Sequence, residues 1–398
     1  IFPNYNAFRA YALRKHSLVK PTIEHPVIIA ANNHNPFINA DVSEISIDVK
    51  NNRNKALEGT INISGEIFEP QSQENPGGEA IAENNFKAIL ENPPLGNISL
   101  FNVDLLLLEY EKSFERALFF PCGSVEKTET DGLYTINNGC IKFKTDPKYA
   151  HSLFSLIYQK ENGEEQEWLK HNYPEHAPFA FWNPFIGGIH SAFDDMSTEQ
   201  MLKEQISAEF IETADNFGNI WHGIRTTLDV REFEDKKGFA LHSYYLTLPG
   251  LPIICNFFEC ANNSGLTEYM GLYNRTRLFG GEELKDSCIE VYDIAKDKRT
   301  MRMGSVDQES PLENLMKLMS SSREESLYIF KPKKSPSIVE TNSAGGDNKI
   351  ISFVSSFEMQ IPNGGAFKSS PAFYIISKHE LSSDALSDLE RIKFDENN

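Results

Sequence analysis

The sequence has few cysteines, and their number and spacing exclude the common cysteine-based designs. The five are Cys122, Cys140, Cys255, Cys260 and Cys288, an odd number without the CxxC spacing of zinc or redox sites. Cys255 and Cys260 are five apart in a strand-like run, so they should point to opposite faces and not bridge each other. We therefore expect reduced cysteines and no metal.

Long apolar runs are also missing. Leu105–Leu108 is among the longest, far short of the roughly 20 residues that cross a bilayer, so we expect no membrane span. No charged-then-apolar leader is present, which favours a cytoplasmic protein, with a removed signal peptide as the alternative. Because the sequence starts at Ile1 and not at Met, we expect a chain that is processed or is a fragment of something longer, in which case an upstream domain would precede it.

Positive charge is scarce relative to negative charge. Lys and Arg number 38 against 57 Asp and Glu, a formal net charge of −19. A protein that binds nucleic acid needs a basic face. Such a face would be opposed here by the negative potential of the rest of the protein, so we expect no nucleic-acid partner. Acidity of this kind is typical of a soluble protein.

Several catalytic motifs are absent as well. The sequence has no GxSxG, HExxH or GxxxxGK[ST]. Its Gly-Gly pairs lack the strand-to-helix setting of a dinucleotide loop. We therefore predict no cofactor.

What the sequence does contain is a series of short alternating strands. Glu44–Val49 and Leu57–Ile63 alternate strictly, with a turn cluster between them and a polar loop predicted at Gln71–Glu79. This pattern predicts an immunoglobulin-like β-sandwich over residues 26–125. Residues 1–25, with helical propensity at 6–15, would be a linker or the tail of an upstream domain.

A second, larger β-domain is predicted over residues 130–392, after a charged hinge at Glu126–Asp131. It opens with a hairpin at Leu133–Lys144, in which Asn138-Gly139 predicts a type I′ turn. The many strands that follow favour a mostly β fold of two large stacked sheets with a few short helices. Those helices are expected at Ser197–Gln205, Ser310–Met319 and Leu381–Arg391.

Three stretches are candidate ligand sites. Phe179–His190 combines aromatics and amides without charge and offers Trp182, Asn183 and His190, which suit the apolar faces and hydroxyl rim of a sugar. The alternative is a core-facing loop in which Trp182 only packs.

The second stretch, Asn219–Val230, offers Trp221, His222 and Arg225, which could hold sugar oxygens or transfer protons near neutral pH. The alternative is a satisfied polar pair at a sheet edge. The third stretch, Tyr273–Glu283, contributes Arg275, with a solvated loop as its alternative.

The order of these features resembles the galactose mutarotase-like superfamily over roughly residues 130–392. The matching segments are the hairpin with its following turn and strand, His222-Gly223 before a strand, a strand ending at Asn262-Asn263, and a closing strand at Pro371–Ile376. The resemblance implies a carbohydrate-handling β-supersandwich with a concave sugar site.

The sequence departs from the epimerases of that superfamily at one motif. Those enzymes carry a second His in a His-Pro-aromatic motif after the Asn turn, where this sequence has Tyr273-Asn274-Arg275. The candidates for catalysis that remain are His222, Arg225 and, as a carboxylate near the end of the chain, Glu358.

Three functions are compatible with these features. The first is a carbohydrate-recognising module with a carbohydrate ligand, as one region of a larger carbohydrate-active protein. The second is a sugar epimerase, lyase or hydrolase with His222 in acid–base catalysis. The third is a non-catalytic structural or assembly protein. The predicted ligand-binding residues are Trp182, Asn183, His190, Trp221, His222, Arg225 and Arg275.

Overall fold

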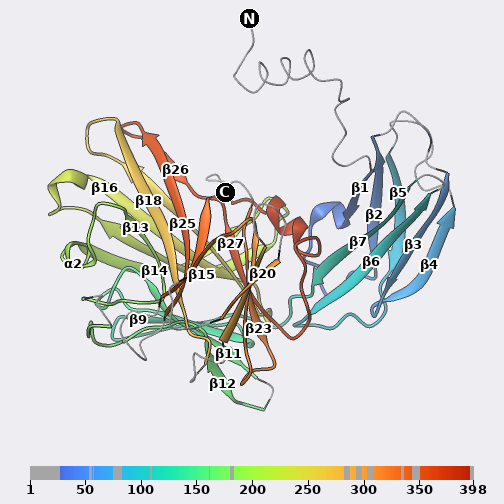
Figure 1. Cartoon of the computed structure of the whole chain (residues 1–398), viewed down its shortest axis with the longest axis horizontal. Helices are drawn as coiled ribbons and strands as arrows, with labels where there is room; N and C mark the ends of the chain where they lie inside the picture. Colours follow the sequence, from blue (N-terminus) through green and yellow to red (C-terminus); the bar gives the residue numbers. More distant parts are fainter. Residues whose placement is uncertain are drawn as a thin grey trace, which may run out of the picture.

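The protein consists of a smaller and a larger β-sandwich that lie side by side (Figure 1). The computed structural model describes residues 27–52, 56, 58–74, 83–107, 110–160, 162–179, 183–281, 287–292, 298–302, 308–332, 336–342 and 350–394. The predicted tail at residues 1–25 and Trp182 lie outside the described residues. No helix among those residues is long and apolar enough to cross a membrane.

The smaller sandwich has a three-stranded and a four-stranded antiparallel sheet. Alternation in β2 places Ile45, Ile47 and Val49 inside, where they meet Ile61 and Val103 of the other sheet. Two packed sheets with a shared core thus occupy this part of the chain, while the predicted bounds of the domain and its immunoglobulin-like kinship stay predictions. Its strands are β1 (Val27–Ala31), β2 (Glu44–Asn51) and β5 (Glu83–Ile89), and β4 (Phe68–Glu74), β3 (Gly59–Gly65), β6 (Ile98–Leu107) and β7 (Tyr110–Phe119).

The larger sandwich contains two ten-stranded antiparallel sheets. We call the first the β18 sheet. Its strands in spatial order are β21 (Gln308–Pro311), β24 (Ser337–Asn342), β25 (Ile350–Ile361), β18 (Glu268–Leu278), β13 (Ile189–Phe193), β11 (Leu153–Gln159), β10 (Ile141–Thr145), β9 (Leu133–Asn137) and β8 (Glu126–Thr130), with β12 (Glu165–Glu167) on β11.

We call the second the β16 sheet. Its strands in spatial order are β14 (Gln205–Ala214), β15 (Ile220–Asp229), β16 (Phe239–Thr247), β17 (Ile253–Asn262), β27 (Ala372–Ser377), β23 (Ser326–Phe330), β22 (Leu315–Ser320), β19 (Ser287–Tyr292) and β20 (Lys298–Arg302), with β26 (Ala366–Lys368) on β17. The mostly β class and the two large stacked sheets are confirmed.

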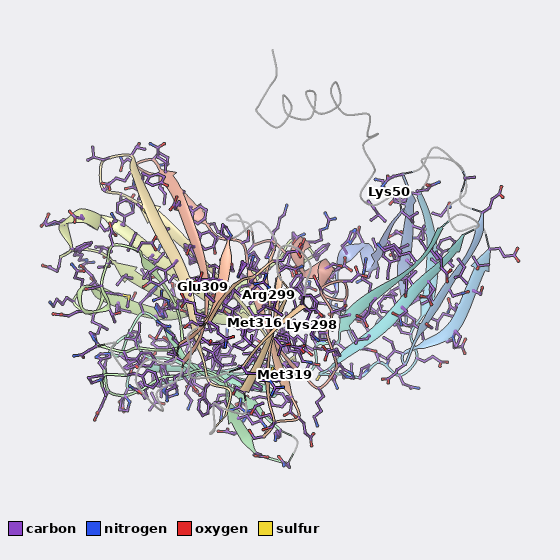
Figure 2. All side chains as sticks on the ribbon, viewed as in Figure 1. Lys50, Lys298, Arg299, Glu309, Met316 and Met319 are labelled. Atoms are coloured by element: carbon purple, nitrogen blue, oxygen red, sulfur yellow. The ribbon has the colours of Figure 1, made fainter. Side chains whose placement is uncertain are left out.

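Buried side chains fill the space between the two large sheets, and Met316, labelled in Figure 2, is one of them. A few polar bonds cross this core. The hydroxyls of Thr276 and Tyr374 lie 2.5 Å apart, and the Tyr245 hydroxyl donates to the Ile189 carbonyl at 2.9 Å. These bonds identify which residues of β18 point inward, because Thr276 and its alternate neighbours must share one face.

The cysteine predictions hold. All five cysteines are free, and Cys255 and Cys260 belong to different core clusters on opposite faces of β17. Burial raises the pKa of the Cys260 thiol to about 12, so this side chain stays a neutral apolar group.

The helix predictions were largely wrong. Ser310–Met319 forms parts of β21 and β22, where Met316, Leu318 and Ser320 are buried at every second position. The helix at Ser197–Gln205 shrinks to α2 (Thr198–Met201), which begins with a capping box at Ser197. The segment Leu381–Arg391 holds only the 3-10 turn Ser387–Arg391, and two further 3-10 turns lie at Asn32–His34 and Glu234–Lys236.

Three loop predictions also change. Residues 126–130, expected as a hinge, form β8 and pair with β9, so the large sheet starts before residue 130. Residues 71–74, expected in a loop, belong to the edge strand β4, where Pro70 is tolerated. Only Gly139 of the Asn138-Gly139 pair has a positive φ, so the turn is not type I′. The Asn138 side chain shapes it by accepting from the amides of Cys140 and Ile141.

The smaller sandwich and the C-terminal segment 381–394 together cover the side of the β16 sheet that faces away from the core. Phe37 packs edge-on against Trp221, with ring centres 5.3 Å apart. Arg116 of β7 lies 3.1 Å from Asp384, and the Ala117 amide donates to the Ala385 carbonyl at 3.0 Å. This side of the β16 sheet is therefore an interface, whereas the corresponding side of the β18 sheet carries a different set of side chains.

Candidate functional site

The sequence-predicted residues divide between the two large sheets. Trp221, His222 and Arg225 lie on β15 of the β16 sheet. His190, Arg275 and Glu358 lie on β13, β18 and β25, which are neighbours in the β18 sheet. The structure therefore does not bring the candidates together in one site.

Trp221 cannot stack on a sugar, which corrects the prediction. Its side chain is 0% exposed and packs against Phe37, Phe373 and Phe394. The indole Nε1 donates to the Asp215 carboxylate at 3.0 Å, so the one polar atom of the ring is satisfied inside the interface. Trp221 is an anchor between the two sandwiches.

His222 and Arg225 do not share a pocket, because residues three apart on a strand point to opposite faces. His222 Nδ1 lies 3.2 Å from Glu212, a carboxylate that also binds Lys127 at 2.5 Å. Arg225 pairs with Glu209 on the neighbouring strand β14. Each residue thus contacts a carboxylate of the edge strand β14, although His222 Nδ1 and Arg225 Nε have no hydrogen-bond partner among the described residues.

The other candidates converge on the side of the β18 sheet that faces away from the core. Since Thr276 points inward, the alternate residues Tyr273, Arg275 and Arg277 point outward. His190 stands directly opposite Arg275 on one side of β18, and Glu358 stands opposite Gly271 on the other. We define the β18 face as His190, Asp194, Tyr273, Arg275, Arg277 and Glu358.

Arg275 is the central cation of this face. Its guanidinium carbon lies 4.7 Å from the centre of the Tyr273 ring, a cation–π distance. Its Nε is buried, and among the described residues no hydrogen-bond acceptor reaches it. A buried N–H without an acceptor costs free energy, about 1–3 kcal/mol for a typical group, so a ligand oxygen here would be favoured.

Arg277 is more enclosed and is held by its own sheet. It donates to the Ser352 hydroxyl of β25, and the backbone bonds of Arg277 with Gly188 and Lys170 attach the preceding loop to β18. Burial and the nearby charge of Arg275 lower the pKa of Arg277 to about 9. Two guanidiniums on one strand face therefore repel each other, although Arg277 remains charged at neutral pH.

His190 is a buried neutral imidazole. Burial, and then the positive charges of Arg275 and Arg277, lower the pKa of His190 well below its ordinary value. Its Nδ1 has no hydrogen-bond partner among the described residues, and its ring lies edge-on to Tyr273 at 6.0 Å. A neutral ring nitrogen can accept from or donate to a ligand hydroxyl.

Asp194 was not predicted as a site residue, and its position depends on a glycine. The Asp194 amide donates to the Gly271 carbonyl at 3.1 Å, and the carboxylate lies directly over Gly271. A Cβ on residue 271 would lie 2.1 Å from Asp194 Oδ2, far closer than non-bonded atoms can approach. Burial, together with the charges of Asp195 and Glu358, raises the pKa of Asp194.

An aromatic wall stands next to β13, formed by β11 and by the segments before and after that strand. Phe154 and Tyr173 stack with ring centres 4.1 Å apart and planes 6° from parallel. Tyr149 packs edge-on against Tyr173 and stacks on His176 at 4.8 Å. Asn183 is exposed further along the chain, and the aromatic-plus-amide site expected at Phe179–His190 stays a prediction.

Sequence reasoning missed Asp194, Gly271 and Tyr273 as site residues. The signal in the sequence was the alternation Tyr273, Arg275, Arg277, three polar or aromatic groups on one strand face opposite the apolar Leu272 and Leu278. The alternation of residue types identifies which side chains share a face of the strand, but it does not show which face is covered by other parts of the protein. No three His, Cys, Asp or Glu side chains among the described residues gather as a metal site requires.

Comparisons with known proteins give likeness in structure only. No family model matches the sequence, and no curated protein matches it. Among solved structures, a TPR-domain containing protein from Parabacteroides distasonis aligns with 70% of this chain at 11% identity and a TM-score of 0.45. This chain spans half the length of that protein.

Two further structures have names that bear on the sequence resemblance. A galactose mutarotase-like protein from Lactobacillus casei aligns with 62% of this chain and all of its own, at 12% identity and a TM-score of 0.43. A putative aldose 1-epimerase from Klebsiella pneumoniae aligns with 74% of this chain and 87% of its own, at 9% identity and a TM-score of 0.47. The identities and TM-scores of all three alignments are low, and nothing about the family or the activity of this chain follows from them.

Proposed function

We propose that this chain recognises a carbohydrate on the β18 face. The single observation that carries the proposal is Arg275, a guanidinium over the Tyr273 ring with a buried Nε that has no acceptor among the described residues. A sugar hydroxyl would supply the missing acceptor. Its ring would find apolar surface on Tyr273 and on the wall formed by Phe154 and Tyr173.

The rest of the β18 face complements a hydroxylated ligand. His190 offers a neutral ring nitrogen, while Asp194 and Glu358 offer carboxylate acceptors. Donors, acceptors and aromatic rings within one strand face favour a ligand with many hydroxyl groups over an apolar one. Asn183 is the exposed amide predicted from the sequence and would contact the same ligand at its rim.

Calorimetric titration with a panel of neutral and acidic sugars tests the proposal. We expect saturable heat from the wild type, at least about tenfold weaker binding for Arg275→Ala and no change for Arg225→Ala, since a hydrogen bond to a charged group contributes about 1.5–3 kcal/mol. Arg225 is the matched control because it lies on the other sheet and pairs with Glu209. Absence of heat for the wild type over the whole panel would sink the proposal.

A second candidate, proton transfer on a bound sugar, is favoured by the two carboxylates. Asp194 lies over Gly271, which stands opposite Glu358, and Glu358 is among the causes that raise the pKa of Asp194. Acid–base work on sugars commonly uses a pair of carboxyl groups, one that donates a proton and one that accepts it. We expect Asp194→Asn and Glu358→Gln each to abolish epimerase, lyase or hydrolase turnover on the bound sugar, and turnover that survives both changes would end this hypothesis.

His222 is not the acid–base residue of this proposal, because it lies on the other sheet beside Glu212 and Lys127. The structural or assembly role, the third hypothesis from the sequence, stays a prediction. It would require stable association in light scattering without any sugar binding, so the same titration separates it from the other two.

A further inference from the structure

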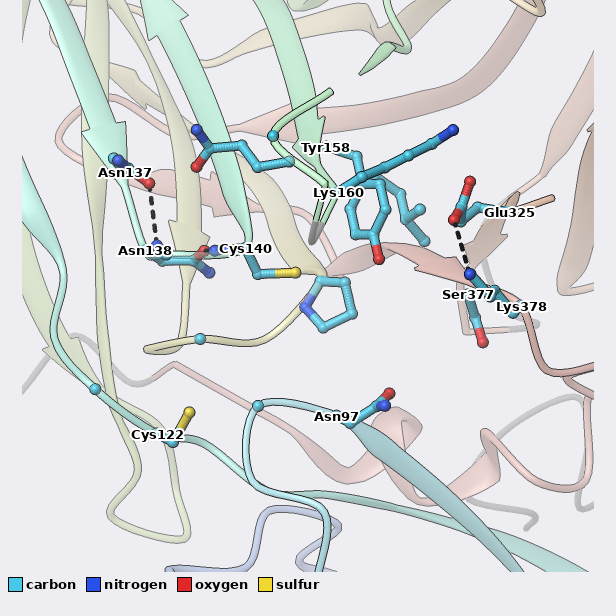
Figure 3. A pocket seen from close by; sticks show the side chains of 18 of the residues that line it. Asn97, Cys122, Asn137, Asn138, Cys140, Tyr158, Lys160, Glu325, Ser377 and Lys378 are labelled. Atoms are coloured by element: carbon cyan, nitrogen blue, oxygen red, sulfur yellow. Dashed lines mark hydrogen bonds and ion pairs between the residues drawn. The ribbon is translucent and has the colours of Figure 1, made fainter. Parts of the chain in front are cut away.

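A second hollow of the described part of the protein lies away from the β18 face. A groove of about 1010 Å³ lies where the smaller sandwich meets one end of the larger one (Figure 3). One side comes from Gly96, Asn97 and Cys122, and the other from two turns, with Asn137–Cys140 in the first and Gln159, Lys160, Asn162 and Gly163 in the second. No residue of the β18 face lines it, so the two sites are independent.

We propose that this groove is a second binding site, for a neutral oligosaccharide. Its volume is at the upper end of the roughly 300–1,000 Å³ of sites for drug-sized molecules, so it has room for several sugar rings. Three observations choose the ligand class: a buried carboxylate without a full set of partners, the balance of charge and the mixture of apolar and amide groups in the walls.

The buried carboxylate is Glu325, which is only 2% exposed. Its Oε1 lies 3.6 Å from Lys378 Nζ, and its Oε2 has no hydrogen-bond partner among the described residues. A carboxylate oxygen held away from water without a donor is costly, and a ligand hydroxyl would satisfy it. The side chain of Lys378 is 60% exposed and can move aside to admit that hydroxyl.

The charges around the groove nearly balance. Glu126, Glu324 and Glu325 face two ammonium groups, Lys160 and Lys378. Lys378 Nζ lies 2.8 Å from Glu324, so part of this charge is already paired. A polyanion would meet three carboxylates and a polycation would compete with Lys378, so a neutral ligand fits better than either.

The walls combine apolar surface with amides. Tyr158, Pro252 and Ile376 offer apolar faces, and Asn97, Gln159 and Asn162 offer amide donors and acceptors beside them. In Figure 3 the Tyr158 ring and the Asn97 amide lie on opposite sides of the opening. Sugar rings present apolar C–H faces and hydroxyl rims, which such a lining can contact at once.

An extended peptide is the less suitable occupant. Peptides that add to a sheet need a row of unpaired backbone groups along an edge strand. The walls here are mostly turns, and the edge strand β8 contributes only Glu126. The groove therefore lacks the backbone ladder that would hold a strand.

The test uses the full chain carrying Arg275→Ala, which weakens binding at the β18 face at least about tenfold. Neutral oligosaccharides of three to six units are titrated into this protein, with an oligogalacturonate and an unstructured peptide as competing classes. We expect saturable binding of a neutral oligosaccharide that weakens at least tenfold with Tyr158→Ala or Glu325→Gln. Glu199→Gln, an exposed pair partner of Lys203, should change nothing.

Each outcome decides between the two sites. Wild-type binding that disappears with Arg275→Ala supports the β18 face and overturns the groove. If the affinity is unchanged by Arg275→Ala but is lost with Tyr158→Ala, the result supports the groove and counts against the β18 face. Preference for the oligogalacturonate or the peptide, or no binding at all to the Arg275→Ala protein, overturns the groove. If a groove variant does not fold, the backbone amide signals of Gly123, Gly139 and Gly163 are followed in the Arg275→Ala protein instead. A ligand bound in the groove must change these chemical shifts, because the three residues line it.

Discussion

The two large sheets have outward sides of opposite character. The β16 sheet presents Trp221, Phe257 and Phe373 there, and the smaller sandwich and residues 381–394 cover them. The β18 sheet presents Tyr273, Arg275 and Glu358, with no such cover among the described residues. The outward side thus packs against the smaller sandwich in the β16 sheet, whereas in the β18 sheet, as we propose, it binds a carbohydrate.

The comparison teaches that no function can be assigned to a polar or aromatic residue on a strand until it is known which face of the sheet its side chain lies on. Trp221 and Tyr273 are both aromatic residues on long strands, each followed by an arginine on the same strand, Arg225 and Arg275. Trp221 is sealed in an interface, whereas Tyr273 carries a guanidinium over its ring. Substitutions on each sheet test this difference, in order of decreasing effect.

The largest effect is expected from removing the interface anchor. Trp221→Ala should destabilise the protein by about 3–5 kcal/mol, because it empties a fully buried site between the two sandwiches and leaves Asp215 without its indole donor. Denaturant unfolding measures the change, with the exposed Leu266→Ala as control at less than about 0.5 kcal/mol. A Trp221→Ala protein of unchanged stability would show that this side of the β16 sheet is not a packed interface.

The next effect concerns the pH dependence of stability. Burial, and then the charge of His242, lower the pKa of His151 to about 3, so the folded protein keeps this ring neutral while the unfolded chain takes up a proton below its ordinary pKa of 6.5. Stability should therefore fall as pH drops through the window from 6.5 to 3, by about 1.4 kcal/mol per pH unit for this one histidine.

Comparison of two variants isolates that contribution. His151→Gln should flatten the acid slope of the free energy of unfolding by that amount. Ser243→Ala removes the hydroxyl 3.1 Å from His151 Nε2 without removing the titrating ring, so it should lower stability and keep the slope. Equal slopes for the wild type and His151→Gln would contradict a neutral buried His151.

A smaller and more local effect is expected from Gly271→Ala. The new Cβ would occupy the position of the Asp194 carboxylate, so Asp194 must leave the β18 face while the strand itself accepts alanine. We expect sugar affinity to fall about threefold to tenfold, with a loss of stability of about 1 kcal/mol. In an Asp194→Ala background the same change should have no further effect on affinity, and an undiminished effect there would show that Gly271 acts by another route.

The fold could be predicted from the sequence wherever burial is one-sided. β2, β10 and β22 all bury alternate residues, and this period correctly identified β2 and β10. It was misread at residues 310–319, because four apolar residues in the six of β22 hid the alternation of Met316, Leu318 and Ser320. The helix expected at Ser197–Gln205 was overestimated because Gln205 begins β14, so local propensity yields there to sheet pairing.

The candidate site could be predicted only in part, for a reason of geometry. His190, Arg275 and Glu358 are 85 and 83 residues apart along the chain, and only the registers of β13, β18 and β25 make them neighbours. His222 and Arg225 are close in sequence but lie on opposite faces of β15. Asp194 depends on the absent side chain of Gly271, a contact between strands that no local pattern encodes.

The most direct test of the central claim is to map backbone amide chemical shifts as the sugar selected by titration is added to the wild-type protein. If recognition is on the β18 face, the signals that move belong to residues of β13, β18 and β25 around His190, Arg275 and Glu358, and those of β14 and β15 stay in place. Shifts confined to β15 around His222 and Arg225 would contradict the account.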